Sequence, residues 1–66
     1  MKNKIKIERA KLNITQQELA DKVGVSRQTI NSIELNRYIP STTLALKIST
    51  LFKITVNEIF ELEEED

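Results

Sequence analysis

The sequence predicts an all-α fold, a compact bundle of five helices joined by short loops. Apolar residues recur at helical spacing along most of the chain. Ser or Thr stands just before several of these stretches, where helix N-caps occur. Only one Gly and one Pro are present, too few for a loop-rich or all-β design. The 66 residues form one domain, 1–66, because domains usually hold about 50–250 residues.

The first two helices are predicted from an amphipathic stripe and a capping box. One face of the first helix holds Ile5, Arg9 and Leu12. Thr15 and Glu18 have the capping-box spacing, in which the Thr oxygen accepts from the third helical amide and the Glu reaches back. The apolar positions of the second helix are Leu19, Ala20 and Val23. This helix ends at Gly24, which can adopt the positive φ of a tight turn.

The third helix is predicted to run from Arg27 to about Leu35, with Ser26 as its N-cap. Its inward positions are Ile30 and Ile33. Residues 36–40 form a loop, because Pro40 forces the residue before it out of the helical region.

Two further helices complete the bundle. Ser41 caps a fourth helix that runs to about Phe52. Thr55 and Glu58 form a second capping box, which opens a short fifth helix. The inward residues of this last part are Val56, Ile59 and Phe60.

The two ends of the chain alternate between charged and uncharged residues, most of them apolar, over 2–7 and again over 60–63. A period of two is typical of a strand, and lysines opposite glutamates suit an antiparallel pair. A short terminal antiparallel β-pair and frayed termini both fit this pattern.

The residue types that are absent exclude many functions. The chain has no Cys and no His, so the usual ligands of zinc and Fe–S clusters and the commonest nucleophiles and general bases are missing. We therefore expect no metal, no cofactor and no enzymatic activity. No apolar run approaches the roughly 18 residues of a membrane span, and the first residues mix charge with every apolar side chain, unlike a signal peptide. The expected location is the cytoplasm.

The net charge of zero hides a split along the chain. Residues 1–53 hold all ten Lys and Arg and four acidic residues, a net +6, whereas residues 54–66 hold six acidic residues, a net −6. A basic body with an acidic tail, here 61–66, suggests a polyanionic partner. An ordinary solvated surface is the alternative.

The segment 16–35 combines a capped helix, a glycine turn and a second capped helix. The turn is too short for antiparallel helices, so the two helices must cross steeply, as in helix-turn-helix DNA readers. With Ile30 inward, the outer face of the second helix holds four polar residues: Arg27, Gln28, Asn31 and Ser32. Arg pairs bidentately with guanine, and Gln or Asn with adenine. This face therefore predicts base reading, although for the helix alone a polar solvent face is the alternative.

Several runs of the sequence resemble those of the Cro/CI-type helix-turn-helix family, also described as XRE-like or lambda-repressor-like. They are Gln16–Ala20, Val23–Ile30, Ile33-Glu34, Tyr38-x-Pro40-Ser41 and Leu46–Ile48. The likeness covers residues 5–60 and is strongest to short stand-alone members, such as the small repressor of cytolysin operons. It implies a five-helix bundle with a small terminal sheet, which binds a double-stranded DNA operator as a homodimer and represses transcription.

The resemblance also implies roles for individual residues. Contacts with DNA phosphates would come from Gln16, Ser26, Thr29, Asn36, Arg37 and Tyr38, and Thr29 would also lie close to a thymine methyl. Arg9 and Glu34 match a structural ion pair that joins the first helix to the recognition helix. Glu8 and Thr42 stand where apolar residues are usual. Leu35 stands where many relatives are polar; it could contact a sugar or a thymine methyl, or pack under the loop that holds Tyr38.

A dimer interface is predicted within 44–62. The apolar arc of the fourth helix spans roughly 220° of a helical wheel, against the roughly 100° that a core-facing helix needs. Leu44 and Leu51 would then bury against a second copy, with help from Ile59, Phe60 and Leu62. The alternative is that the last helix and the tail cover this stripe within one chain.

The sequence therefore indicates a DNA-binding regulator, which would lie on the nucleoid when bound. Repression would be steric: a dimer on a near-palindromic site excludes polymerase, with most of the affinity coming from phosphate contacts. An activator role also fits the sequence. The rival class is a protein-interaction module, such as an antitoxin or a co-regulator with the same fold.

Overall fold

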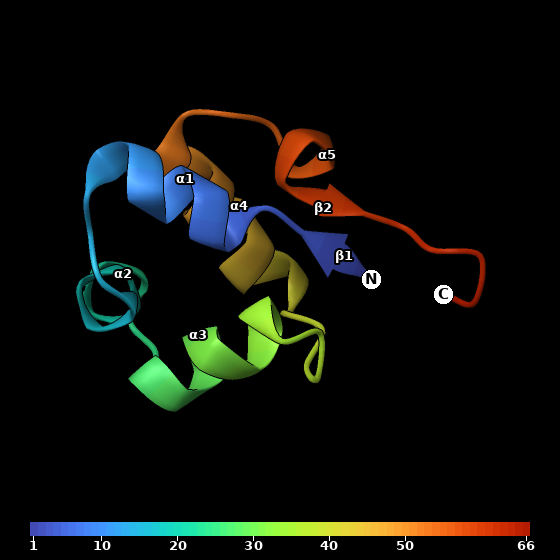
Figure 1. Cartoon of the computed structure of the whole chain (residues 1–66), viewed down its shortest axis with the longest axis horizontal. Helices are drawn as coiled ribbons and strands as arrows, with labels where there is room; N and C mark the ends of the chain where they lie inside the picture. The colour runs from blue at the N-terminus through green and yellow to red at the C-terminus, as the bar shows by residue number, and fades with distance from the viewer.

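The computed structural model describes residues 1–66 in the order β1-α1-α2-α3-α4-α5-β2 (Figure 1). The helices are α1 (Ile5–Leu12), α2 (Gln16–Val23), α3 (Arg27–Glu34), α4 (Thr42–Phe52) and α5 (Val56–Ile59). The strands are β1 (Lys2–Asn3) and β2 (Phe60–Glu61). The five-helix fold and the short antiparallel β-pair are both confirmed.

Side-chain caps begin four of the five helices. Thr15 and Thr55 each form a complete capping box, and Ser26 and Ser41 each accept from an amide in the first turn of their helix. At the second box, the Thr55 backbone N–H and its hydroxyl both donate to Glu58 Oε1, each at 3.0 Å. These two bonds, the backbone one first, lower the pKa of the Glu58 carboxyl below its ordinary value.

The β-pair joins the two ends of the chain. Lys2 lies opposite Glu61 and Asn3 opposite Phe60, so the predicted Lys–Glu arrangement occurs once. The alternation over 2–7 does not correspond to a strand of that length, because α1 already begins at Ile5, whose side chain is fully buried. Beyond β2, the acidic tail turns back, and its Asp66 carboxylate lies 3.1 Å from the Met1 amino group.

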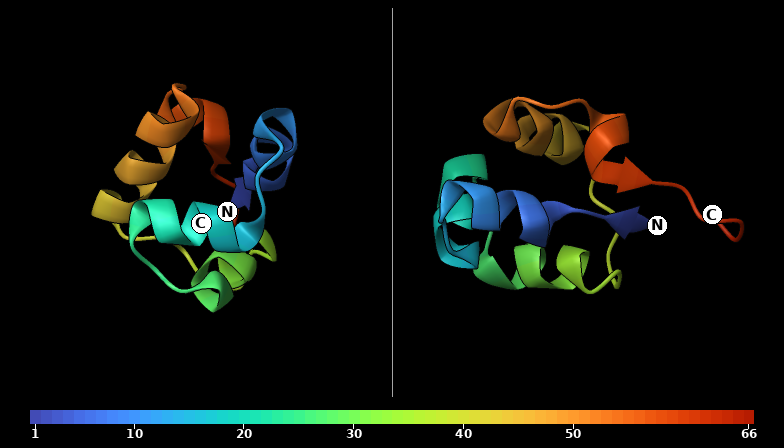
Figure 2. Two further views of the ribbon diagram at one scale, coloured as in Figure 1. Left: turned by 90° about the vertical axis from the view of Figure 1, so that its left-hand side faces the viewer. Right: turned by 45° about the horizontal axis from the view of Figure 1, so that its top comes forward.

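One hydrophobic core lies between the helices and the β-pair, and α4 and α5 cover it on the side opposite α3 (Figure 2). The fully buried large side chains are Ile5, Leu19, Ile30, Ile33, Ile48 and Ile59. Leu12, which shares a face of the first helix with Ile5 and Arg9, is 51% exposed and lies outside the core. The helix ends there, because Asn13 takes the left-handed conformation with φ 55° and leaves Leu12 at the rim.

The core also corrects the predicted dimer interface. Leu44, Ile59 and Phe60 are at most 7% exposed within one chain, so they have almost no surface left for a second copy. The helical wheel of α4 did not predict that Leu44 is buried within one chain, because α4 packs against both α2 and α5. This is the alternative arrangement considered for the sequence. Leu51 is half-buried and packs against the core, and Leu62 is exposed.

No helix of the chain has both the length and the apolar character needed to cross a membrane.

Candidate nucleic-acid interface

Helix α3 presents one apolar and one polar face. Ile30 and Ile33 are buried in the core, whereas Arg27, Gln28 and Asn31 are exposed and Ser32 is half-buried. Helix α2 packs against α3 across the turn at Gly24, whose φ of 76° is the left-handed conformation that glycine adopts without strain. The glycine turn thus lets α2 cover the inner face of α3 and leaves the outer face to solvent, along the lower edge of Figure 1.

The N-terminus of α3 is held by two hydroxyl residues. Ser26 Oγ accepts from the Thr29 backbone N–H at 3.1 Å, and the two hydroxyl oxygens lie 3.0 Å apart. The amides of the first turn that Ser26 does not cap remain available to an anion, as at other helix N-termini. Both residues were predicted to contact phosphate, and they form one local cluster at this end of the helix.

The loop after α3 begins with a Schellman-type turn. The Arg37 N–H donates to the Ser32 carbonyl at 2.9 Å, and the Asn36 N–H to the Ile33 carbonyl at 3.0 Å. Asn36 accordingly has φ 60°, the left-handed conformation that Asn tolerates better than most residues. The turn brings Arg37 and Tyr38 back beside α3, where they line one shallow hollow together with Ser26, Gln28, Thr29 and Ser32. Residues predicted to read bases and residues predicted to hold phosphates therefore share one surface.

A polar network joins α1, α2 and α3 behind this surface. Arg9 donates to both carboxylate oxygens of Glu34, from Nε at 2.7 Å and from Nη2 at 3.1 Å, and its Nη1 donates to the Ile14 carbonyl at 3.0 Å. The bonds to Glu34 raise the pKa of the Arg9 guanidinium above its ordinary value. Gln16 Nε2 donates to Glu34 Oε1 and to Asn31 Oδ1, each at 3.1 Å. The network thus fixes two of the predicted DNA-contacting side chains, Gln16 and Asn31, relative to each other.

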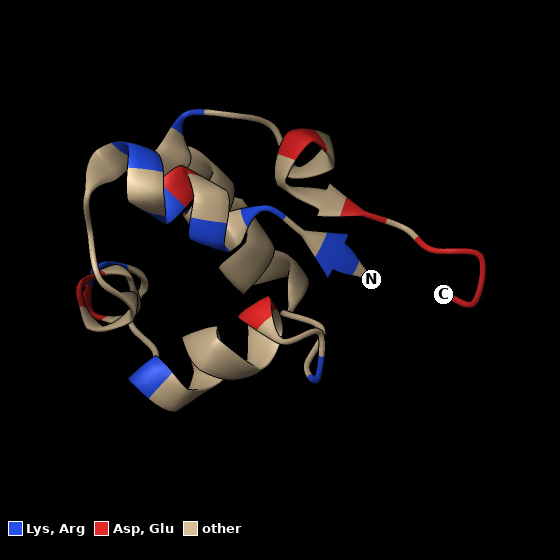
Figure 3. Cartoon of the chain, viewed as in Figure 1, with Lys and Arg blue, Asp and Glu red and all other residues tan.

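The charges on this side of the molecule are mostly basic. Figure 3 shows basic residues at the start of α3 and in the loop that follows it, and an acidic residue at the last turn of α3. That acidic residue is Glu34, which is already paired with Arg9. The acidic C-terminal tail, two of whose carboxylates pair with the Met1 amino group, extends away from α3 (Figure 3). The polar face of α3 therefore offers unpaired cations to an anionic partner.

Sequence reasoning missed one residue at this surface. Asn3 Nδ2 donates to the Ile33 carbonyl at 2.8 Å and to Asn36 Oδ1 at 3.1 Å. Local patterns give no signal for this contact, because 30 residues separate Asn3 from Ile33. Leu35 is 51% exposed, so about half of its side chain remains available for contact with a partner.

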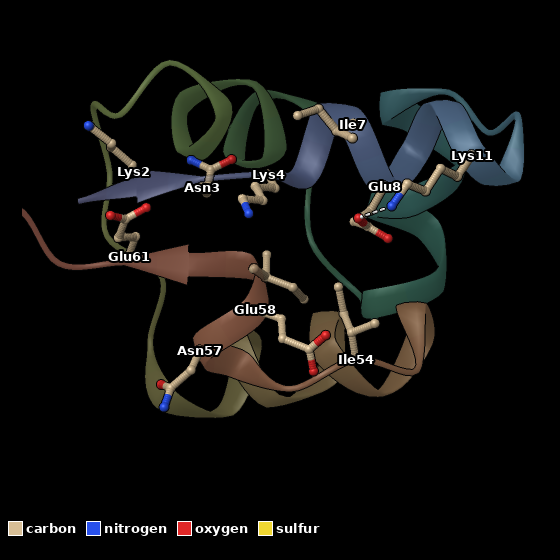
Figure 4. A pocket seen from close by; sticks show the side chains of 11 residues that line it. Lys2, Asn3, Lys4, Ile7, Glu8, Lys11, Ile54, Asn57, Glu58 and Glu61 are labelled. Carbon is tan, nitrogen blue, oxygen red and sulfur yellow. Dashed lines mark hydrogen bonds and ion pairs between the residues drawn. The ribbon is translucent and has the colours of Figure 1, made fainter.

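A separate cleft lies between α1, the β-pair and the start of α5 (Figure 4). Its lining mixes lysines and glutamates, including a pair in which Lys11 Nζ lies 3.0 Å from Glu8 Oε2. The mixed charge gives this cleft no preference for a polyanion. No group of three or more Asp and Glu side chains is placed to hold a metal ion.

Helices α2 and α3 cross steeply, since Figure 1 shows α2 end-on while α3 lies across the view, and together with the exposed polar face of α3 they define a helix-turn-helix domain. The chain belongs to the helix-turn-helix family, because the family model described as "Helix-turn-helix" matches residues 5–59. The chain is also 50% identical over 66 residues to an uncharacterised HTH-type transcriptional regulator of Methanocaldococcus jannaschii, with 100% of both chains covered.

Two further relatives have the same description. The uncharacterised HTH-type transcriptional regulator YgzD of Bacillus subtilis is 47% identical over 66 residues, with 100% of both chains covered. One from Archaeoglobus fulgidus is also 47% identical over 66 residues, with 100% of this chain and 93% of the relative covered. The predicted family and the assignment to a DNA-binding rather than an enzyme class are confirmed by these similarities.

Proposed function

We propose that the chain is a transcriptional repressor that binds a near-palindromic DNA operator as a homodimer. In this proposal, α3 lies in the major groove and the loop after α3 contacts the DNA backbone. The observation that carries the proposal is the division of α3 into a buried apolar face and an outer face of Arg27, Gln28, Asn31 and Ser32. These side-chain types match the donor and acceptor pattern of base edges.

In this proposal, the residues around the outer face of α3 contact the DNA phosphates. Arg37 and Tyr38 lie beside α3 in the same hollow as Ser26 and Thr29, and Gln16 lies at the N-terminus of α2. Arg37 supplies affinity and its salt dependence, because a cation that neutralises a phosphate releases a counterion. Arg27 and Gln28 supply specificity, because they lie on the outer face at the N-terminal end of α3, which contacts base edges in helix-turn-helix complexes.

The dimer is proposed to form at the end of the molecule where the β-pair and the loop after α3 lie together (Figure 1). Two exposed apolar residues support this choice: Leu62, 76% exposed, and Ile39, 62% exposed. The longest dimension of one chain is 31 Å. Two copies joined at this end can therefore present their α3 helices about 34 Å apart, one turn of DNA.

Selection from a randomised duplex pool, followed by sequencing, tests the proposal. A two-fold-symmetric site with half-sites about one turn apart is the expected result. Arg27→Ala should then relax the preference at one position of each half-site, whereas Lys6→Ala, on the exposed surface of α1, should leave the site unchanged. Recovery of no consensus, with only weak and salt-sensitive binding, would refute the proposal and favour the protein-interaction module. If the wild-type protein does not repress a reporter that carries the selected site, the repressor role is refuted.

A further inference from the structure

Asn3 connects the β-pair to the end of the recognition helix. Its side chain is half-buried between β1 and the last turn of α3. It makes three hydrogen bonds: Oδ1 accepts from the Ile5 backbone N–H at 3.2 Å, and Nδ2 donates to the Ile33 carbonyl at 2.8 Å and to Asn36 Oδ1 at 3.1 Å. No other side chain of the β-pair contacts α3 or its loop by a hydrogen bond.

The two backbone partners determine which way the Asn3 amide faces. The Ile5 N–H can only donate and the Ile33 carbonyl can only accept. The oxygen of Asn3 must therefore face Ile5 and its nitrogen must face Ile33. The opposite orientation would place an oxygen against a carbonyl and an NH₂ against an N–H.

The orientation of Asn3 in turn determines that of Asn36. The second hydrogen on Asn3 Nδ2 faces the Asn36 side chain, which must present its oxygen as the acceptor. The NH₂ group of Asn36 then faces away from Asn3, and it has no hydrogen-bond partner within the chain. Asn36 is exposed and immediately precedes Arg37 in the loop beside α3.

We propose that Asn3 is a positioning residue for DNA binding, which turns the NH₂ group of Asn36 toward the DNA backbone. A phosphate oxygen can only accept hydrogen bonds, so Asn36 can bind it with its nitrogen outward and not with its oxygen outward. This inference rests on the proposed function, since it assigns a role within the same DNA-binding surface. Asn3 itself does not touch DNA.

A structural role for Asn3 and this positioning role make different predictions. The bond to the Ile33 carbonyl stabilises the end of α3 whatever residue stands at position 36. In the positioning role, by contrast, Asn3 affects DNA affinity only by orienting the side-chain amide of Asn36. Asn36→Gly separates the two, because glycine adopts the left-handed conformation freely and keeps the turn while it removes the amide.

The test is a double-mutant cycle on Asn3→Ala and Asn36→Gly, with a 30-base-pair duplex of fixed sequence at low salt as the probe. In the wild-type background, Asn3→Ala should weaken binding about fivefold, because the freed Asn36 amide can still bind a phosphate but must first be ordered, at a cost of about 1 kcal/mol. In the Asn36→Gly background, the same substitution should change affinity less than twofold. Its effect on the urea midpoint should persist in the Asn36→Gly background, because the bond to the Ile33 carbonyl remains, and should be smaller there only by the contribution of the bond to Asn36. An equal loss of affinity in both backgrounds would overturn the positioning role and leave a structural one.

A second measurement needs no variant and so does not depend on whether the substituted chains fold. In NMR spectra of the wild-type protein, the side-chain NH₂ signals of Asn36 should shift on titration with the duplex, whereas those of Asn3 should stay near their free positions. An Asn36 NH₂ that does not move at saturation would overturn the inference while leaving the proposed function intact. A wild-type protein that binds no duplex would instead refute the proposed function.

Discussion

Glu34 offers a sharp test of how this small domain holds its recognition helix. Its carboxylate accepts from Arg9 Nε at 2.7 Å, from Arg9 Nη2 at 3.1 Å and from Gln16 Nε2 at 3.1 Å. The side chains of Arg9 and Glu34 are only 15% and 7% exposed. Glu34→Ala would leave the Arg9 guanidinium largely covered, with the Ile14 carbonyl as its remaining partner.

The loss of stability expected for Glu34→Ala lies between the values for an exposed ion pair and for a fully buried one. Exposed pairs contribute about 0–1 kcal/mol, and removal of one partner from a fully buried pair costs about 3–5 kcal/mol. Arg9 keeps some contact with water, so we expect Glu34→Ala to cost about 2–3 kcal/mol. A domain of this size has a total stability of roughly 3–10 kcal/mol, and a loss of that size lowers Tm by about 10–20 °C. DNA affinity should fall as well, although Glu34 touches no DNA, because Gln16 loses its acceptor on Glu34 and Asn31 is held only through Gln16.

Urea unfolding of Glu34→Ala, Arg9→Ala and the double variant measures this cost and the coupling between the two residues. The sum of the two single-variant losses in unfolding free energy should exceed the loss of the double variant by more than about 1 kcal/mol. The reason is that each single variant leaves an unpaired partner. Gln17→Ala is the control, since Gln17 makes an exposed hydrogen bond to Asp21 one turn further along α2 and its loss should cost less than about 1 kcal/mol. If Glu34→Ala lowers the free energy of unfolding no more than the control does, or if the single losses are strictly additive, the Arg9–Glu34 pair does not hold the recognition helix in place.

Three further predictions follow from the same structure. Arg27→Ala should cost about 1–3 kcal/mol at one base position, and Arg37→Ala should weaken binding to all sequences and flatten the salt slope by about one unit; the reverse pattern in binding titrations would mean that their roles are exchanged. Leu62→Glu should give a folded monomer by sedimentation with weak operator binding, whereas the control Leu46→Glu, at a position of α4 that is 52% exposed, should stay dimeric; a dimer for both variants would show that Leu62 is not in the interface. The pKa of Glu58 is lowered in the folded chain, so its capping bonds stabilise the protein above the unfolded pKa of about 4.3, and this stability is lost as the pH falls through the folded value. Glu58→Gln should flatten the dependence of Tm on pH in that acid range, and an unchanged profile would contradict the assignment.

Local signals predicted most of the elements because the physical cause of each lies within a few residues. The capping boxes at Thr15 and Thr55 are formed between residues three apart, and Gly24 takes the left-handed conformation that its lack of a side chain allows. The polar outer face of α3 was predicted in the same way, because a helix fixes which residues lie opposite Ile30. The Arg9–Glu34 pair, 25 residues apart, was instead implied by the family resemblance.

The order of residues alone was enough to place this chain among the helical members of the helix-turn-helix family and to predict which side chains its third helix offers to a partner. How far the apolar residues of α4 and α5 are covered follows from the tertiary structure, because burial depends on how neighbouring elements pack and not on the helical wheel. It assigned Leu44, Ile59 and Phe60 to the core and left Leu62 exposed. It also brought Asn3 to the end of α3, a contact between distant residues that the pairing of the two chain ends creates.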